Sequence, residues 1–316
     1  MELLDGYAVM DGLDIIYYVV GLPKNNGIWA YPKYIPDPFG DRIINNRKYK
    51  KLPNPIIAID HLRKLKPDVI EKIGETEFPL LKYNDIKHIF NPKTTLQDMI
   101  KRDPVIKELV YLISGNDNRI LQNLGITGSR LLNANTIDSD IDLIFYGDHE
   151  TSKRIYQHLK ELRKNNLTKP VYGEKIKELW KERSDTPINY KLFKLIEQRK
   201  IVQGMFKRYM YSIKLFDYTA WSLGLPLGRT RFKGIILDDS TSMLFPPSYI
   251  IKPTKIIEGP LELHTPIKVI SYRSRFWEIA SKGSLIKVQG ILQNINNNKL
   301  VIINYKYGNI IPLLNS

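Results

Sequence analysis

The chain has 316 residues, enough for two or three domains with substantial hydrophobic cores. Its 48 Lys and Arg against 33 Asp and Glu give a net charge of +15. This excess favours polyanionic partners such as nucleic acid or a nucleoside triphosphate, although a lysine-rich proteome produces it as well. The absence of cysteine excludes disulfides and thiolate metal sites, and the five histidines lack the spacing of a zinc site.

The first 95 residues begin with strand-like runs at 7–10, 15–22 and 28–34. The run at 15–22 is too short to cross a bilayer, so we expect a buried strand, no membrane partner and a cytoplasmic location. The basic run at 42–51 contains Tyr49. It is interpreted either as a nucleic-acid contact that stacks one base or as a solvated loop.

Helix is predicted over 97–125, with Pro104 as a start and Gly115 as a break. A compact Gly128-Ser129 turn follows. A strand is predicted at 140–146. Downstream of it, the pattern predicts three helices, at 150–165, 176–183 and 190–202, and then a strand at 209–216.

The strand at 140–146 carries two carboxylates on one face. Because side chains alternate along a strand, Asp140 and Asp142 point one way, while Ile141, Leu143 and Phe145 point towards a core. Carboxylates about 7 Å apart repel each other unless a cation lies between them, and Mg²⁺ prefers such hard oxygen ligands. The pair therefore indicates a divalent metal site.

The Gly128-Ser129 turn supplies a complementary group. Glycine lets the backbone approach an anion closely, and backbone N–H groups with a serine hydroxyl hold phosphate oxygens. Arg130 adds a candidate charge-assisted contact. The bland alternative is an ordinary turn with a helix cap, followed by a solvated strand edge that bears Asp138, Asp140 and Asp142.

Together, Gly128, Ser129, Asp140 and Asp142 resemble the signature of the DNA polymerase beta superfamily of nucleotidyltransferases. That signature is a hydrophobic residue, Gly-Ser or Gly-Gly, a gap of about ten residues and Asp-hydrophobic-Asp. Here Thr127 replaces the hydrophobic residue. The strict resemblance covers about residues 118–217, and the whole chain is similar to a predicted archaeal nucleotidyltransferase family.

The resemblance implies a third carboxylate on a neighbouring strand, which binds the metal and helps to deprotonate the acceptor. The matching strand is 209–216, where Ser212 occupies the expected slot, and serine is a poor Mg²⁺ ligand and base. Asp217, Asp238 and Asp239 are candidate substitutes.

The last 90 residues change character, with apolar strand runs at 233–237, 249–252, 255–257, 267–271, 285–292 and 299–305. These runs predict an antiparallel barrel that resembles an OB-fold. Within it, residues 272–277 alternate cations with aromatics, as a single-strand binding surface does, although an aromatic barrel corner has the same pattern.

We therefore expect an α+β protein with an N-terminal basic β/α domain (1–95), a nucleotidyltransferase domain with a mixed sheet and flanking helices (96–225) and a C-terminal β domain (226–316). The expected function is transfer of a nucleoside monophosphate from an NTP to a hydroxyl of RNA or DNA, with Asp140 and Asp142 binding Mg²⁺ or Mn²⁺ and Gly128, Ser129 and Arg130 holding the triphosphate. A protein hydroxyl is a second acceptor. The alternative is a non-catalytic nucleotide- or nucleic-acid-binding protein, which Ser212 favours.

Overall fold

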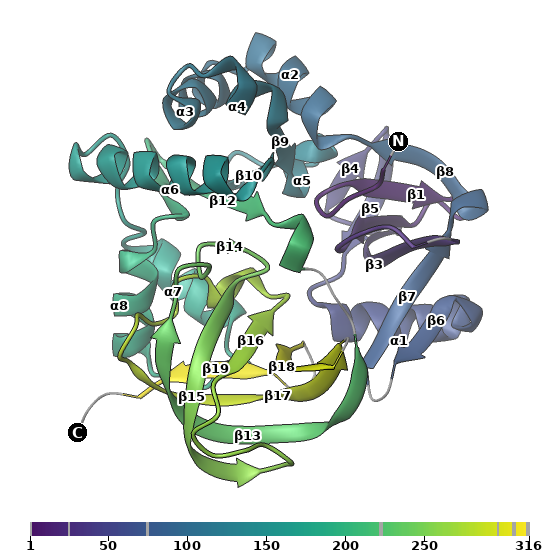
Figure 1. Ribbon diagram of the computed structural model, residues 1–316. Helices are drawn as coiled ribbons and strands as arrows, with labels where there is room; N and C mark the ends of the chain where they lie inside the picture. Colours follow the sequence, from purple (N-terminus) through teal and green to yellow (C-terminus); the bar gives the residue numbers. More distant parts are fainter. Residues whose placement is uncertain are drawn as a thin grey trace. The chain divides into compact units, whose positions relative to one another are not determined.

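The computed structural model describes residues 2–24, 26–73, 76–220, 224–295, 297–304 and 308–313 (Figure 1). Contacts within the chain group it into two compact units, Met1–Tyr146 and Gly147–Ser316. Both units combine helices with sheets, which confirms the α+β class. Within the described ranges, no helix is both long and apolar enough to cross a membrane.

The first unit opens with an antiparallel sheet whose main order is β4-β5-β3-β2-β1-β8, with β7 pairing β3 and β6 pairing β7. Its elements are β1 (Ala8–Asp11), β2 (Ile16–Val19), β3 (Gly27–Pro36), β4 (Arg42–Ile44), β5 (Arg47–Lys51), α1 (Pro55–Leu65), β6 (Ile70–Ile73), β7 (Thr76–Lys82) and β8 (Ile86–Phe90). The apolar run at 15–22 therefore contains a buried strand, β2.

The basic run at 42–51 forms the β4–β5 hairpin. Tyr49 is 1% exposed and belongs to a buried cluster with Ile16, Tyr34 and Ile44. Its ring is therefore closed to a nucleotide base, and the stacking interpretation is wrong. The solvated-loop alternative is wrong as well, because Lys48 and the neighbouring basic residues project from paired strands.

Helices follow the sheet, and local sequence signals set their ends: α2 (Pro92–Arg102), α3 (Pro104–Ser114) and α4 (Asn118–Asn123). Asp103 caps α3 by accepting hydrogen bonds from the amides of Val105 and Ile106. Pro104 occupies the first turn, where no amide donor is needed, and Gly115 ends the helix in the left-handed conformation. The predicted start and break are confirmed. The unit closes with β9 (Leu124–Thr127), α5 (Gly128–Leu131) and β10 (Ile141–Tyr146).

The second unit begins with helices and a small mixed sheet. Its first elements are α6 (His149–Lys164), α7 (Glu174–Glu182), α8 (Tyr190–Arg199), β11 (Gln203–Phe206), β12 (Tyr209–Phe216) and β14 (Leu244–Phe245). β11 pairs antiparallel with β12, and β14 pairs parallel with it. The strand predicted at 209–216 is β12, with Tyr211, Ile213 and Leu215 in the core and Ser212 half-buried.

The remaining strands join in a ring of pairings. They are β13 (Leu225–Asp238), β15 (Ser248–Glu258), β16 (Ile267–Ser271), β17 (Leu285–Ile295), β18 (Asn298–Ile303) and β19 (Asn309–Pro312). Pairing runs β13-β15-β16-β18-β17 and returns to β13, while β19 pairs with β17. β16 and β18 are parallel, so the fully antiparallel barrel expected from the sequence is corrected at this pairing. Tyr305, at the end of the expected run 299–305, lies outside the described residues.

Residues 272–277 form a buried corner of this ring. Phe276 and Trp277 are 0% and 2% exposed, and the Trp277 indole donates to the carbonyl of Leu244 at 2.9 Å. Arg273 is also buried and pairs with Asp185. The structure therefore supports the aromatic-corner interpretation, and the single-strand binding interpretation is wrong.

Candidate functional site

Gly128 and Asp142 meet where β9 ends and α5 begins. Asp142 lies opposite Thr127 in the antiparallel β9–β10 pair. A Cβ atom added to Gly128 would lie 2.5 Å from Oδ2 of Asp142, so the carboxylate faces the glycine. Gly128 also has φ +65°, a conformation that L side chains rarely adopt. The structure thus brings the glycine and one predicted carboxylate into direct contact.

Arg130 joins this corner to the start of β10. Its side chain is buried, and it donates from Nε to the carbonyl of Asp140 and from Nη2 to the carbonyl of Ser139, both at 3.1 Å. Nη1 lies 3.8 Å from Oδ2 of Asp103. These contacts support a positioning role for Arg130, and its contact with a triphosphate stays a prediction.

Ser129 and Asp140 lie on either side of this arginine in the sequence, and both are half-buried. Within the described part of the chain, no hydrogen-bond partner is recorded for the Ser129 hydroxyl. Asp140 directly precedes β10, and Asp142 is the second residue of that strand. Both residues therefore lie at the strand end whose backbone carbonyls Arg130 holds.

Thr127 shows how the family's hydrophobic position accommodates a polar residue here. The side chain is 7% exposed, and its hydroxyl donates to the carbonyl of Gly6 at 3.0 Å. A buried hydroxyl with a partner avoids the cost of desolvation. The departure from the signature is thus compensated within the first unit.

Two tyrosines from the N-terminal sheet complete the surroundings of Asp142. The Tyr18 hydroxyl donates to the Gly128 carbonyl at 2.6 Å, and its ring lies 6.5 Å from that of Tyr34. Burial raises the pKa of Tyr18 well above its usual range, and the charges of Tyr34 and Asp142 raise it further. Burial is also the main cause that raises the pKa of Tyr34 to about 12, with the Asp142 charge contributing. Both phenols stay protonated at neutral pH.

No sequence pattern indicated a role for these tyrosines, because Tyr18 lies in an apolar run that predicts only a buried strand. Ile144 and Tyr146 were also unexpected. They alternate with Leu143 and Phe145 yet are 0% and 4% exposed, so β10 is buried on both faces beyond Asp142. The partly exposed polar side chains of this strand are therefore confined to the end that carries Asp140 and Asp142.

Two of the three carboxylates suggested as substitutes for the third ligand, Asp217 and Asp238, have local roles in the second unit, and the candidacy of Asp239 stays a prediction. Asp217 accepts hydrogen bonds from the amide and hydroxyl of Thr219. Asp238 accepts hydrogen bonds from the backbone amide and the hydroxyl of Ser240. The hydrogen bond from the Ser240 amide is the main cause that lowers the pKa of Asp238. Each carboxylate already stabilises a turn.

The donor set suits a metal that shares its shell with a substrate. Among the residues described, no group of three or more His, Cys, Asp or Glu side chains is arranged to hold an ion. Mg²⁺ commonly binds one or two carboxylates and completes its octahedron with water and substrate phosphates. Asp142, which faces Gly128, and Asp140, two residues before it, are residues of the type that this mode uses.

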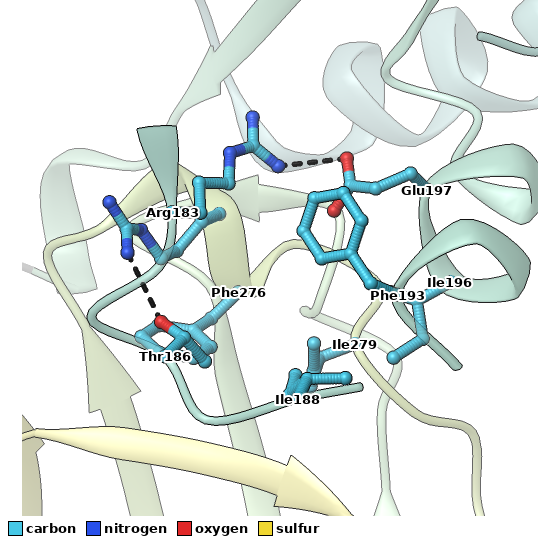
Figure 2. Close-up of a pocket in the computed structure, with 9 residues that line it drawn as sticks. Arg183, Thr186, Ile188, Phe193, Ile196, Glu197, Phe276 and Ile279 are labelled. Atoms are coloured by element: carbon cyan, nitrogen blue, oxygen red, sulfur yellow. Dashed lines mark hydrogen bonds and ion pairs between the residues drawn. The ribbon is translucent and has the colours of Figure 1, made fainter. Parts of the chain in front are cut away.

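A separate pocket lies in the second unit, between α7, α8 and the aromatic corner (Figure 2). Its lining is Arg183, Thr186, Ile188, Phe193, Ile196, Glu197, Arg275, Phe276 and Ile279. The volume of about 250 Å³ includes open solvent and falls below the range of about 300–1,000 Å³ that is typical of ligand sites. The pocket is therefore too small for a nucleotide.

A buried charge network borders this pocket. Glu197 is 2% exposed and contacts Arg183 at 2.8 Å and Lys200 at 2.7 Å (Figure 2 shows the Arg183 contact). Burial raises the pKa of Glu197, but the two cations outweigh it and hold the value at about 2. Burial lowers the pKa of Lys200 to about 8, because Glu197 only partly compensates and Arg183 opposes it. All three groups stay charged at pH 7, and the network stabilises the unit.

Comparison with known proteins identifies a related protein, but that protein has no assigned activity. No protein-family model matches the chain. An uncharacterized protein of Methanocaldococcus jannaschii is 27% identical over 277 residues, which cover 80% of this chain and 81% of the relative.

We expect Gly128→Ala to destabilise the first unit by more than the cost of placing an alanine at a positive φ. A left-handed alanine costs about 1–2 kcal/mol, and overlap with the Asp142 carboxylate adds about 1 kcal/mol or more. Gly283→Ala is the control, since Gly283 also has a positive φ of +86° and nothing within 4 Å of an added Cβ. Urea unfolding of the two variants measures the difference, and equal losses would contradict the contact with Asp142.

Arg130→Lys tests whether the arginine positions the site. Lysine keeps the charge but cannot reproduce two diverging N–H bonds, so we expect a loss of about 1–3 kcal/mol in unfolding free energy. Arg102→Lys on the exposed end of α2 provides the control. An unchanged unfolding free energy together with weaker nucleotide binding would instead make Arg130 a ligand.

We expect Glu197→Gln to cost about 3 kcal/mol at pH 7, because it leaves the buried Lys200 and the half-buried Arg183 without their carboxylate. The folded pKa of about 2 lies below the ordinary 4.5, so the stabilisation is present above pH 4.5 and is lost as the pH falls towards 2. Urea unfolding between pH 7 and pH 2 should therefore show that the difference in unfolding free energy between the wild type and Glu197→Gln shrinks below pH 4.5. Exposed Glu182→Gln should show no such window.

Proposed function

We propose that the chain is a metal-dependent nucleotidyltransferase of the DNA polymerase beta type. The observation that carries this proposal is the Asp142 carboxylate facing Gly128, which Ser129 follows in the chain, with Asp140 two residues before Asp142 at the same end of β10. In this proposal the two carboxylates supply hard oxygen ligands at a corner where the backbone can approach a phosphate closely. Phosphoryl chemistry depends mainly on such positioning and on neutralisation of charge.

Each residue of the corner has a role in this proposal. Ser129 and the backbone at Gly128 hold the triphosphate, while Asp140 and Asp142 hold Mg²⁺ or Mn²⁺. When bound, the metal offsets charge on the leaving pyrophosphate and lowers the pKa of the acceptor hydroxyl. The acceptor oxygen forms a bond to the α-phosphorus as the bond from that phosphorus to the pyrophosphate oxygen breaks.

The enclosure of the corner also supports the proposal. Tyr18 fixes the Gly128 carbonyl, and Arg130 fixes the carbonyls of Ser139 and Asp140. A catalytic constellation must be held to within about 0.5 Å, which requires supporting side chains of this kind.

The proposed nucleic-acid acceptor is based on the net charge of +15, and the proposed cytoplasmic location is based on the need for NTP.

The ring of pairings in the second unit supports a likeness to the OB-fold. It closes through five strands, β13, β15, β16, β18 and β17, with both parallel and antiparallel neighbours. OB-folds are five-stranded Greek-key barrels that commonly bind oligonucleotides. This likeness is consistent with an RNA or DNA acceptor.

Replacing both carboxylates, Asp140→Asn with Asp142→Asn, should lower label transfer from a radiolabelled NTP at least about 100-fold, because several kcal/mol of metal-dependent stabilisation are lost. Asp138→Asn is the matched control, since Asp138 is an exposed carboxylate two residues away. The assay uses Mg²⁺ or Mn²⁺ with RNA, DNA and protein acceptors. Equal transfer by the double variant and the control would refute the assigned roles.

The second candidate is a binding protein that keeps the site without turnover. Ser212 favours it, because this half-buried serine in β12 takes the slot of the family's third carboxylate. Calorimetry with Mg²⁺ and each NTP separates the two functions. Magnesium-dependent binding without transfer to any acceptor supports the binding protein.

A further inference from the structure

We propose that the outer face of β13, β15 and β17 binds the phosphate backbone of a nucleic acid through a row of lysines. Lys233 of β13 lies directly opposite Lys255 of β15 on one side and Lys287 of β17 on the other. The three strands run side by side (Figure 1). Since neighbouring strands are about 4.8 Å apart, the row places three ammonium groups across about 10 Å.

The burial of their neighbours shows that these lysines face outwards. Phe232 and Val288 are 0% exposed and belong to the hydrophobic core, and Ile256 packs against that core. Because side chains alternate along a strand, the lysine next to each of these residues points away from the core. The burial pattern along β13 agrees, with Lys233 only half-buried between Phe232 and Gly234.

Like charges directly opposite each other on a sheet destabilise it unless an opposite charge lies nearby. None of the three lysines forms an ion pair with any residue that the structure describes. In the registers that pair these strands, Glu258 lies next to the row and already contacts Arg231 at 3.5 Å, and Asp238 accepts hydrogen bonds from Ser240. Among the described residues the row therefore has no ion-pair partner, and an external anion would compensate its positive charge.

The shape and chemistry of the row indicate a backbone ligand. Lysine acts as a flexible point charge on phosphate, and a flat row crossing three strands can follow successive phosphates. The outward positions that pair with this row, among the described residues, include no aromatic side chain that could stack a base. Binding should therefore be independent of sequence and sensitive to salt.

This face would hold the acceptor of the proposed transfer, and in that respect it rests on the proposed function. Binding can nevertheless be measured without nucleotide or metal. Fluorescence anisotropy with a labelled RNA duplex and its single strand is compared for the wild type, a row variant (Lys233→Gln, Lys255→Gln, Lys287→Gln) and a matched variant (Lys181→Gln, Lys191→Gln, Lys194→Gln). The matched lysines are exposed on or beside α7 and α8, and each triple change lowers the net charge from +15 by three to +12.

The row variant should bind RNA at least about tenfold more weakly, and its slope of log affinity against log salt should be shallower by about 2–3. The matched variant should retain most of the wild-type slope, and the row variant should not melt at a lower temperature than the wild type, since repulsion is removed. Equal weakening in both variants, no binding by the wild type at low salt, or tighter binding to phosphatidylserine vesicles than to RNA would overturn the proposal. The Asp140→Asn/Asp142→Asn variant should bind RNA as the wild type does, so failure of transfer and failure of binding are distinguishable.

Discussion

A buried guanidinium holds the two parts of the candidate site in register. Arg130 follows the Gly-Ser corner in sequence, and its donors reach the carbonyls of Ser139 and Asp140. The loop between α5 and β10 would otherwise leave those carbonyls without a fixed partner at the edge of a buried strand. Guanidinium suits this task because it is planar, always charged and able to donate in several directions at once. Together with the β9–β10 pairing that sets Asp142 opposite Thr127, this side chain fixes the backbone of the corner relative to the start of β10.

Packing from the N-terminal sheet then encloses the corner. Tyr18 bonds the Gly128 carbonyl, while Tyr34 joins Leu131 and Leu132 in one buried cluster. Both phenols lie in the field of Asp142, whose charge helps to raise their pKa values. Because Tyr18 and Tyr34 keep their protons, they add no negative charge beside Asp142, the carboxylate proposed to bind a metal ion. The sheet thus supports the site as well as its own core.

The second unit uses positive charge in two physically different ways. Lys200 is buried with Glu197 and Arg183 is half-buried beside them, and their desolvation is offset by short ion pairs. Lys233, Lys255 and Lys287 instead project side by side from paired strands. A chain that needed only solubility could disperse such charges and avoid the repulsion. Their alignment is the reason for assigning them a ligand.

The sequence by itself determined the local features whose cause lies within a few residues. Pro104 and Gly115 set the ends of α3, the apolar alternation at 141, 143 and 145 placed those residues in a core, and β12 spans 209–216. Capping, backbone stiffness and side-chain alternation act over such short distances. The pattern also put Gly128 and Asp142 in one motif, and their contact agrees with it.

Only the tertiary structure decided which polar groups were already engaged. Composition could not show that Tyr49 lies in a core or that residues 272–277 form a buried corner, because a strand's partners determine its burial. Tyr18 reaches Gly128 across 110 residues, a contact that no local spacing encodes. The opposed lysines likewise depend on the register of three strands separated in the chain, since register fixes which side chains face each other.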